Sequence, residues 1–341
     1  MRWQNQAGSS PQAQQPRRED SDRRSSVHAA LACRGWLVMT DMFVFYFMYD
    51  LLFSRTTVAR LGLRLRPSVV QLLATHADIS GRGDCGRFLV TECAGPMNLR
   101  QHMELRRRDG LPFEEGEVRD AMRQLLASVE SAHGAGVLHT EIVPENVAVG
   151  QEDVVSDGAV VGRRMVYKIC GFGMSEPAAL AAAEKDDSGL LASPSPYRAP
   201  EPFLGSKDYD GRVNTWGLDC IMAELLAGTG VPFFGCKLDT GVLEKMLYVV
   251  GARGIVKWPG LDRVTAHDQA ARLRKLYRRD RGHLRQVFPR EVLSLAGYKV
   301  LKGLLRSHPD RRLTAAGALR MPWFRRRGLG GYFGGAVLSA N

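Results

Sequence analysis

The chain lacks lysine over nearly half its length: of 341 residues, the first lysine is Lys168. Any site within residues 1–167 that needs an ammonium group therefore has none. Cysteine is also sparse, and the six that occur are scattered, with no Cys-x-x-Cys pair and no histidine at metal-ligand spacing. This pattern argues against a zinc site and favours reduced thiols in the cytosol or nucleus.

No uninterrupted apolar run reaches the length of a membrane span. Residues 36–53 (WLVMTDMFVFYFMYDLLF) are mostly apolar, but Asp41 and Asp50 interrupt them. A carboxylate in the middle of a bilayer costs about 2.5–3.5 kcal/mol. The uninterrupted run covers only residues 42–49, which is the length of a strand or core segment. We therefore expect a buried strand or helix here and not a membrane span.

Basic residues outnumber acidic ones by 47 to 36, which gives a formal net charge of +11. This excess favours acidic partners such as nucleic acid, phosphopeptides or anionic lipid. Much of it lies in residues 272–285, which fit either a solvated helix face or a docking or nuclear-targeting patch. No aromatic interleaving or groove-reading motif accompanies the patch, so we expect no specific nucleic-acid binding.

The first third of the chain indicates a leader followed by a small strand-rich part. Residues 1–32 are rich in Gln, Arg, Ser and Pro and lack hydrophobic periodicity, which predicts a disordered leader. Residues 67–78 and 87–95 read as two short strands around a glycine-rich turn. The turn, residues 81–86 (GRGDCG), has the form Gly-x-Gly-x-x-Gly, but we interpret it as a hairpin turn and not as a phosphate-binding loop.

Helical periodicity dominates the rest of the chain. Apolar residues recur at helical spacing in residues 99–107 and 115–133, and residues 200–323 are mostly helical in character. The apolar positions of the second helix are Val118, Met122, Leu125, Leu126 and Val129. A small strand-rich part that precedes a larger helical part is typical of an α+β arrangement with two lobes.

Four motifs occur in a set order. Residues 139–146 (HTEIVPEN) are similar to the protein kinase catalytic loop, His-Arg-Asp followed at the same spacing by Asn. Residues 170–173 (CGFG) end a strand where that family has Asp-Phe-Gly, and residues 197–201 (YRAPE) match its Ala-Pro-Glu element. Arg312 stands where the family places the arginine that pairs with that glutamate. Each motif alone is weak, but four in the right order are specific.

These motifs identify the chain as a member of the protein kinase family, and it resembles the cyclin-dependent branch. Residues 214–226 (NTWGLDCIMAELL) look like the central helix of cyclin-dependent kinases, and residues 243–260 look like the segment beyond it. Within that branch the chain is similar to divergent cyclin-dependent-kinase-like proteins of plants. The resemblance covers about residues 67–324.

The resemblance implies a two-lobed protein-kinase-like fold of the α+β class. We expect a small, incomplete, strand-rich N-lobe and a large, mainly helical C-lobe. The expected boundaries are a disordered leader at residues 1–32, a degenerate N-lobe at 33–95 that ends at the hinge, a C-lobe at 96–328, and a flexible tail at 329–341.

The resemblance implies phosphoryl transfer from ATP with Mg²⁺, yet several catalytic positions hold other residues. Glu141 replaces the proton-accepting aspartate, and Asn146 stands at the family's magnesium-binding asparagine. Gly171 replaces the magnesium-binding aspartate and has no side-chain oxygen to offer a metal. Thr140 and Val143 replace an arginine and a lysine of the catalytic loop.

The missing lysine adds to these replacements. No lysine is present to serve as the strand lysine that contacts the phosphates; an arginine would supply the positive charge, but its planar fork is not interchangeable with a point ammonium group. The stretch where its glutamate partner would lie reads RTTVARLGLRLR, at residues 55–66. We therefore predict a catalytically impaired pseudokinase that acts by protein binding, and expect that ATP and Mg²⁺, which the family implies, do not bind.

Other family positions are retained. His139 and Phe172 stand where the family packs its internal hydrophobic column, and Glu201 with Arg312 is expected to form a buried pair. Losing one partner of such a pair costs several kcal/mol, on the order of 3–5.

The hinge and the activation segment leave questions open. Thr91, Glu92, Cys93 and Ala94 would form a hinge whose backbone receives an adenine-like ring if a nucleotide binds. Between residues 146 and 171 we expect a hairpin that is enlarged by a surface loop rich in Gln, Glu, Asp and Gly. Serine-proline pairs at residues 193–196 are either phosphorylation sites or turn residues.

Two alternatives remain open. The first is an active ATP-dependent serine/threonine protein kinase that uses Glu141 as its base. The second is that residues 1–66, which match no kinase element, form no functional lobe. In each case we expect a protein partner or substrate and an intracellular location, nuclear or cytoplasmic. Cyclin binding is not expected, because the family's cyclin-recognition helix is not visible in the sequence.

Overall fold

The computed structural model describes residues 36–38, 69–77, 87–178, 195–264, 270–271, 273–275 and 282–325, which fall into two compact units. The smaller unit contains β1 (Trp36–Val38), β3 (Arg87–Glu92) and all but the first residue of β2 (Leu72–Ala77). These strands form one sheet in the order β1-β3-β2, in which β1 pairs antiparallel with β3.

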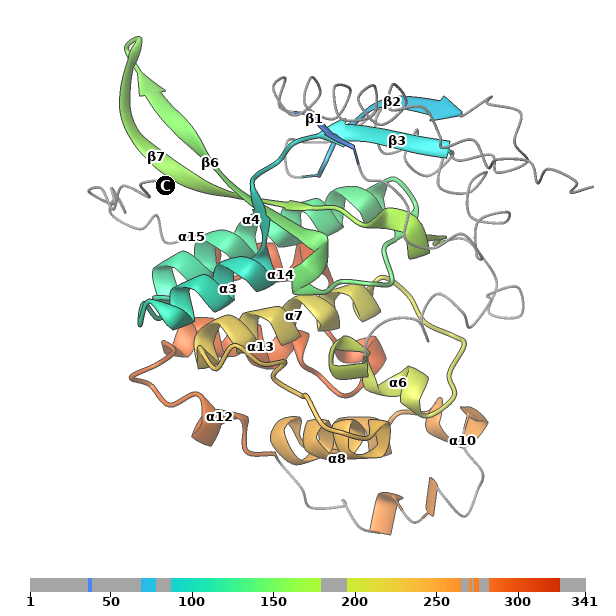
Figure 1. The fold of residues 1–341 in the computed structure, drawn as a ribbon. Helices are drawn as coiled ribbons and strands as arrows, with labels where there is room; N and C mark the ends of the chain where they lie inside the picture. Colours follow the sequence, from blue (N-terminus) through green and yellow to red (C-terminus); the bar gives the residue numbers. More distant parts are fainter. Residues whose placement is uncertain are drawn as a thin grey trace, which may run out of the picture. The chain divides into compact units, whose positions relative to one another are not determined.

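The larger unit is mainly helical (Figure 1), and the two units together confirm the expected α+β class. Its strands are β4 (Met97–Asn98), β5 (Val137–Leu138), β6 (Val147–Ser156), β7 (Ala159–Ile169) and β8 (Glu176–Pro177). Its α-helices are α3 (Leu99–Arg108), α4 (Glu115–Gly134), α6 (Pro200–Phe203), α7 (Arg212–Ala227), α8 (Asp239–Val250), α9 (Arg253–Val256), α10 (Leu261–Val264), α12 (Leu284–Val287), α13 (Leu295–Leu304), α14 (Ala315–Leu319) and α15 (Pro322–Arg325). Short 3₁₀ turns cover η1 (Pro144–Asn146), η2 (Phe172–Met174), η3 (Ser195–Tyr197) and η4 (Pro309–Arg311).

Helices α3 and α4 begin where their sequences provide caps. The Asn98 side chain accepts a hydrogen bond from the backbone N–H of Gln101, whose own side chain accepts one from the N–H of Asn98. These reciprocal bonds satisfy donors that the first turn leaves open. All five apolar positions predicted for the second helix are buried in α4, so that prediction is confirmed.

Helix α7 lies at the centre of the larger unit. Its residues 213–225 are all buried, because neighbouring elements cover it on every side. The Trp216 ring is fully buried and stacks on Phe234 with ring centroids 5.9 Å apart. A helix covered this completely needs a partner for each polar side chain that it carries, which makes its few polar residues informative.

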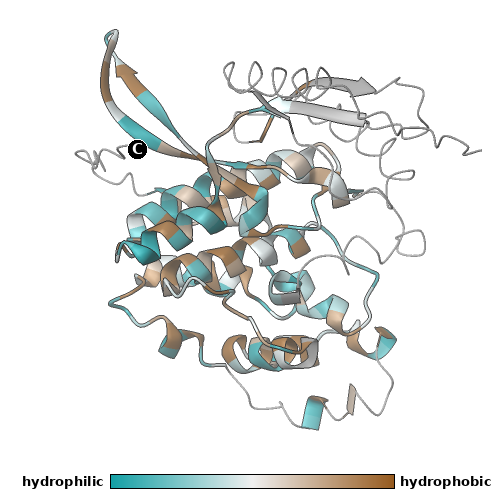
Figure 2. Ribbon diagram, in the orientation of Figure 1, coloured by the Kyte–Doolittle hydropathy of each residue, from teal (hydrophilic) through white to brown (hydrophobic). Residues whose placement is uncertain are grey.

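The expected hairpin between residues 146 and 171 is present, but the polar stretch within it forms no surface loop. Its residues belong to β6 and β7, which pair over their whole length and form one long hairpin. Asp157 and Gly158 close it with φ values of 52° and 79°, the positive φ angles of a two-residue type I′ turn. The hairpin extends away from the helices of its unit (Figure 1) and carries hydrophobic and hydrophilic stretches (Figure 2).

Several predicted segments lie outside the described residues. They are the leader, residues 42–53, the turn at 81–86, Ser193 and the tail beyond residue 325. Of the basic stretch at 272–285, residues 272 and 276–281 are likewise outside them. Among the residues that the structure does describe, no helix combines the length and apolarity needed to cross a bilayer.

Candidate active site

The catalytic-loop histidine is held inside the larger unit. His139 is 1% exposed, its Nε2 lies 2.9 Å from the carbonyl oxygen of Cys170, and its ring centroid lies 4.6 Å from that of Phe172. Burial lowers the pKa of His139 to about 4, so the ring is neutral at pH 7. A neutral, buried histidine that bridges residues 139–146 to residues 170–173 has a structural role, because it joins the two motifs.

Thr140 adopts a conformation that β-branched residues rarely take. Its φ is 63°, in the left-handed region. The backbone N–H of Thr140 donates to Oδ1 of Asn214 on α7 at 2.9 Å, and its hydroxyl donates to the carbonyl oxygen of Met174 at 2.5 Å. Such strain persists only where surrounding contacts hold it in place. Asn214, which the sequence analysis named only as part of the central-helix motif, therefore fixes residues 139–146 against α7.

The two polar residues predicted at the catalytic positions, Glu141 and Asn146, bind each other. The side-chain amide of Asn146 donates to the backbone oxygen of Glu141 at 3.1 Å and to its carboxylate Oε2 at 3.3 Å. Burial is the main reason that the pKa of Glu141 is raised above its ordinary value, and the neighbouring Glu145 raises it further. The hydrogen bond from Asn146 opposes that rise.

Gly171 brings no ligand to this site, and the Asn146 side chain fills the space beside it. The glycine has φ 77° and ψ 40°, a left-handed conformation. A Cβ atom on Gly171 would lie 2.4 Å from Oδ1 and 2.5 Å from Cγ of Asn146, well inside contact distance. A larger residue at position 171 would therefore have to displace the asparagine side chain and also adopt a strained backbone.

The oxygen atoms here fit a magnesium ion poorly. Mg²⁺ prefers six oxygen ligands in near-octahedral geometry, usually including carboxylates. The side-chain oxygen that lies beside Gly171 is that of Asn146, and the Asn146 amide is itself hydrogen-bonded to the carboxylate of Glu141. Within the described residues no cluster of three or more His, Cys, Asp or Glu side chains could hold a metal ion.

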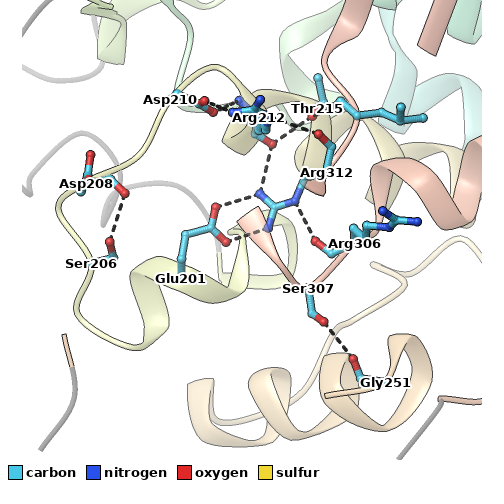
Figure 3. A network of polar contacts seen from close by, with 11 residues as sticks. Glu201, Ser206, Asp208, Asp210, Arg212, Thr215, Gly251, Arg306, Ser307 and Arg312 are labelled. Atoms are coloured by element: carbon cyan, nitrogen blue, oxygen red, sulfur yellow. Dashed lines mark hydrogen bonds and ion pairs between the residues drawn. The ribbon is translucent and has the colours of Figure 1, made fainter. Parts of the chain in front are cut away.

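A buried ion pair anchors the Ala-Pro-Glu element. Arg312 donates to the carboxylate oxygens of Glu201 at 2.8 and 2.7 Å, and their side chains are 0% and 2% exposed. The guanidinium also donates to the carbonyl oxygens of Arg306 and Arg212 at 2.9 and 3.2 Å (Figure 3). It lies 4.9 Å from the ring centroid of Trp216 on α7. The pair thus ties residues 197–201 to the C-terminal helices and to the central helix.

A second polar cluster crosses the region between α3 and α7. Arg100 on α3 is ion-paired with the buried Glu224 on α7, and donates to Glu145 at 2.9 Å. The hydroxyl of Tyr197 donates to Glu224 at 2.7 Å and contacts Arg100 as well. The chain's own arginine therefore neutralises Glu224, and this acidic position has no free charge to offer a ligand.

The predicted hinge residues span the boundary between the two units. Strand β3 ends at Glu92, Thr91 and Glu92 are half-buried, and Cys93 is exposed. Ala94 belongs to the larger unit and lies directly on β6: a Cβ atom on Gly150 would come 2.3 Å from the Ala94 carbonyl oxygen. Backbone this close can form only where the residue has no side chain, so Gly150 sets how the hinge segment meets the hairpin.

The structure thus brings some of the predicted site residues together. Glu141, Asn146 and Gly171 form one cluster, with His139 and Phe172 packed behind it. The Glu201–Arg312 pair and the hinge residues lie in other parts of the chain.

Comparison with known proteins places the chain among kinase relatives. The family described as "Protein kinase domain" matches residues 60–324. The chain is 41% identical over 263 residues to "Putative cyclin-dependent kinase F-2" of Oryza sativa subsp. japonica, covering 76% of this chain and 73% of that protein. It is 33% identical over 220 residues to "Cyclin-dependent kinase G-2" of Oryza sativa subsp. indica, covering 63% of this chain and 28% of that protein.

Among solved structures, the chain resembles one in the "Crystal Structure of the yeast RNA Pol II CTD kinase CTDK-1 complex". The TM-score is 0.64, the sequence identity is 16%, and the likeness covers 86% of each chain. At this identity the likeness concerns the fold alone, and it confirms the predicted kinase fold.

Proposed function

The chain belongs to the protein kinase family and resembles its cyclin-dependent members, and we propose that it is a pseudokinase, which binds other proteins but does not transfer phosphate. The family implies ATP and Mg²⁺ as cofactors. On this proposal the chain has lost the use of both, and its well-packed larger unit remains as a binding scaffold.

The contact between Asn146 and Glu141 is the observation that carries the proposal. Phosphoryl transfer depends on neutralising charge and aligning the phosphate, which kinases do largely through metal-bound carboxylates. Here the carboxylate at the base position accepts a hydrogen bond from the amide at the metal position, at 3.3 Å. Position 171 is glycine, and the space beside it is filled. The glycine removes one magnesium ligand, and the hydrogen bond turns the Asn146 and Glu141 side chains toward each other instead of toward a metal ion.

The missing lysine points the same way. Because no lysine precedes Lys168, the phosphates lack the ammonium group that active relatives place on a strand of the small lobe. Arginine is available, but its planar fork does not have the geometry of a point charge.

A phosphotransfer assay tests the proposal. The full chain would be incubated with radiolabelled ATP, Mg²⁺ or Mn²⁺ and a generic basic substrate, beside a Glu141→Gln variant and an active cyclin-dependent kinase. We expect the chain and the variant to show the same background incorporation. Robust phosphorylation that Glu141→Gln abolishes would refute the proposal.

A second candidate is an active serine/threonine kinase that uses Glu141 as its base. Glu141 keeps a carboxylate at the base position, and burial raises its pKa, which is the direction that strengthens a general base. On this hypothesis, Gly171→Asp restores a metal ligand and raises activity strongly. If that variant still binds no nucleotide, the hypothesis fails.

Partners and location follow from the same proposal. Two relatives carry the words "cyclin-dependent" in their names. The sequence shows no counterpart of the family's cyclin-recognition helix, so we propose a protein partner other than a cyclin. We infer an intracellular location, nuclear or cytoplasmic.

A further inference from the structure

Two adjoining cavities flank the C-terminal half of helix α3. One has a volume of about 520 Å³ and the other about 180 Å³, and Arg107 and Gly230 line both. The larger lies within the range of cavities that bind small ligands or peptide side chains, about 300–1,000 Å³. We call them together the α3 groove. It runs between α3 and the turn that follows α7, and its lining does not include the catalytic-loop residues.

The loop between α3 and α4 forms one wall and is held firmly. Arg106 donates to the carbonyl oxygens of Leu111 and Pro112 at 3.2 and 2.9 Å. Its guanidinium pairs with Glu117 at 2.6 Å and lies 4.4 Å from the ring centroid of Phe113. These bonds hold the loop with the Leu111 side chain 54% exposed at the rim of the smaller cavity. The wall is preorganised, which lowers the entropy lost when a ligand binds.

The turn after α7 forms the other wall. Helix α7 is capped by Gly228 with φ 63°, and Gly230 follows with φ 72°. A Cβ atom on Gly230 would lie 2.6 Å from Cδ of Arg107, so the glycine leaves room for the arginine to lie across the turn. The smaller cavity is therefore lined both by this arginine and by the exposed side chain of Leu111.

The charges along the groove favour an anionic ligand. Glu224, at the floor of the smaller cavity, is already ion-paired. Arg107 is exposed, and within the part of the chain that the structure describes its guanidinium makes no hydrogen bond or ion pair. Arg108 lies 3.9 Å from Asp109, and both side chains are largely open to solvent, so this pair is weak. Against these two arginines, the larger cavity is lined by one acid, Glu104.

We propose that the α3 groove docks a peptide segment of a partner protein in which a carboxylate lies beside an apolar side chain. The guanidinium groups of Arg107 and Arg108 would bind the carboxylate, since the arginine fork matches its two oxygens. The apolar side chain would pack against Met103, Leu111 and Phe113. The inference rests on the proposed function, because both assume that this chain acts by binding another protein. It adds the chemistry of the segment that the partner would present.

A peptide-display selection on the full chain tests the inference. Short random peptides would be selected against the wild-type chain. The enriched peptides would be synthesised and titrated by fluorescence anisotropy. The groove variant is Arg107→Glu/Arg108→Glu, and the matched control is Lys299→Glu/Lys302→Glu, an exposed pair on α13 with the same change of net charge. Because every substituted side chain is exposed, thermal melting should show all these proteins folded.

We expect the enriched peptides to combine Asp or Glu with a large apolar residue. Their affinity should fall by about tenfold or more in the groove variant, the size of one charge-assisted contact, and stay unchanged in the control. A further variant, Leu111→Ser, should weaken binding by about tenfold because one apolar contact is lost. The inference is wrong if no peptide is enriched, if the enriched peptides lack acids, or if the groove variant binds them as well as wild type does. Kinase activity would refute the pseudokinase proposal and leave these binding results unchanged, so the two failures are distinguishable.

Discussion

Replacing Arg312 with alanine should destabilise the larger unit more than any exposed substitution. The variant removes both hydrogen bonds to Glu201, which is left as a buried carboxylate without its cation. It also removes donors from the carbonyl oxygens of Arg306 and Arg212, and the contact with Trp216. The Glu201 carboxylate and the Trp216 ring lie inside the unit, where water cannot replace the lost contacts.

The expected size of the effect follows from that burial. Removing one partner of a buried ion pair costs about 3–5 kcal/mol, because the remaining charge is uncompensated. For a domain of this size, about 1 kcal/mol lowers Tm by about 2–4 °C, so the expected fall is about 6–20 °C. Replacing both residues with leucine removes the orphaned charge together with its partner. The double variant should therefore be more stable than the sum of the single losses predicts, by about 2–3 kcal/mol.

Thermal unfolding followed by circular dichroism measures these differences. The variants are Arg312→Ala, Arg312→Leu, Glu201→Leu and the double-leucine chain, and Arg320→Ala serves as the control because Arg320 is an exposed arginine of the same region. The reasoning is refuted if Arg312→Ala lowers Tm no more than the control does, or if the two leucine substitutions are additive.

Three further predictions concern the candidate site and the core. Gly171→Asp should lower the free energy of unfolding by about 1–3 kcal/mol, because position 171 has a positive φ and no room for a Cβ atom. The control is Gly173→Asp, where a Cβ atom would meet nothing within 4 Å, and the same melting assay should show it to be nearly neutral. Asp219 is fully buried without a hydrogen bond of standard geometry, and burial raises its pKa well above the ordinary value. The unfolded chain therefore releases this proton near pH 4 and the folded chain only at higher pH, so wild type should lose stability relative to Asp219→Asn as pH rises from about 4 to about 8; a difference that stays constant with pH would contradict this. Burial raises the pKa of the Cys170 thiol to about 11, so at neutral pH iodoacetamide should modify the exposed Cys93 well before Cys170. Mass spectrometry follows the two rates, and equal rates would show the reasoning to be wrong.

Local patterns predicted the helical parts of the fold well. The apolar spacing of α4 predicted both its extent and its buried face, because a helix against a core needs that periodicity. The ion pair of Glu201 with Arg312 joins residues 111 positions apart, and only the order of the family motifs made it foreseeable.

The β6–β7 hairpin was expected, but the length of its strands was not. The polar residues in its middle suggested a loop, yet the Asp157-Gly158 pair is a strong signal for a two-residue hairpin turn when strand-forming residues flank it. The valines on both sides supply those residues, and cross-strand ion pairs such as Arg163 with Asp153 explain why the middle of the hairpin is polar.

Other features of the site could not be read from the sequence. That Gly171 replaces an acid is plain, but the filling of its space by Asn146 depends on the positions of two loops that meet only in the folded chain. The burial of Asp219 likewise depends on α7 being covered on every side, whereas periodicity alone indicates one buried face.

The central claim is most directly tested by a thermal-shift titration of the full chain with ATP, with and without Mg²⁺, beside an active cyclin-dependent kinase as positive control. A ligand present at about a hundred times its dissociation constant adds about 2.7 kcal/mol to stability, which is readily seen as a rise in Tm. The account predicts no rise in Tm at any ATP concentration that shifts the control, because the position of the metal-binding aspartate is glycine and the phosphate-binding lysine is missing. A magnesium-dependent rise in Tm of several degrees would contradict the account, since other residues would then have to replace both the metal-binding aspartate and the phosphate-binding lysine.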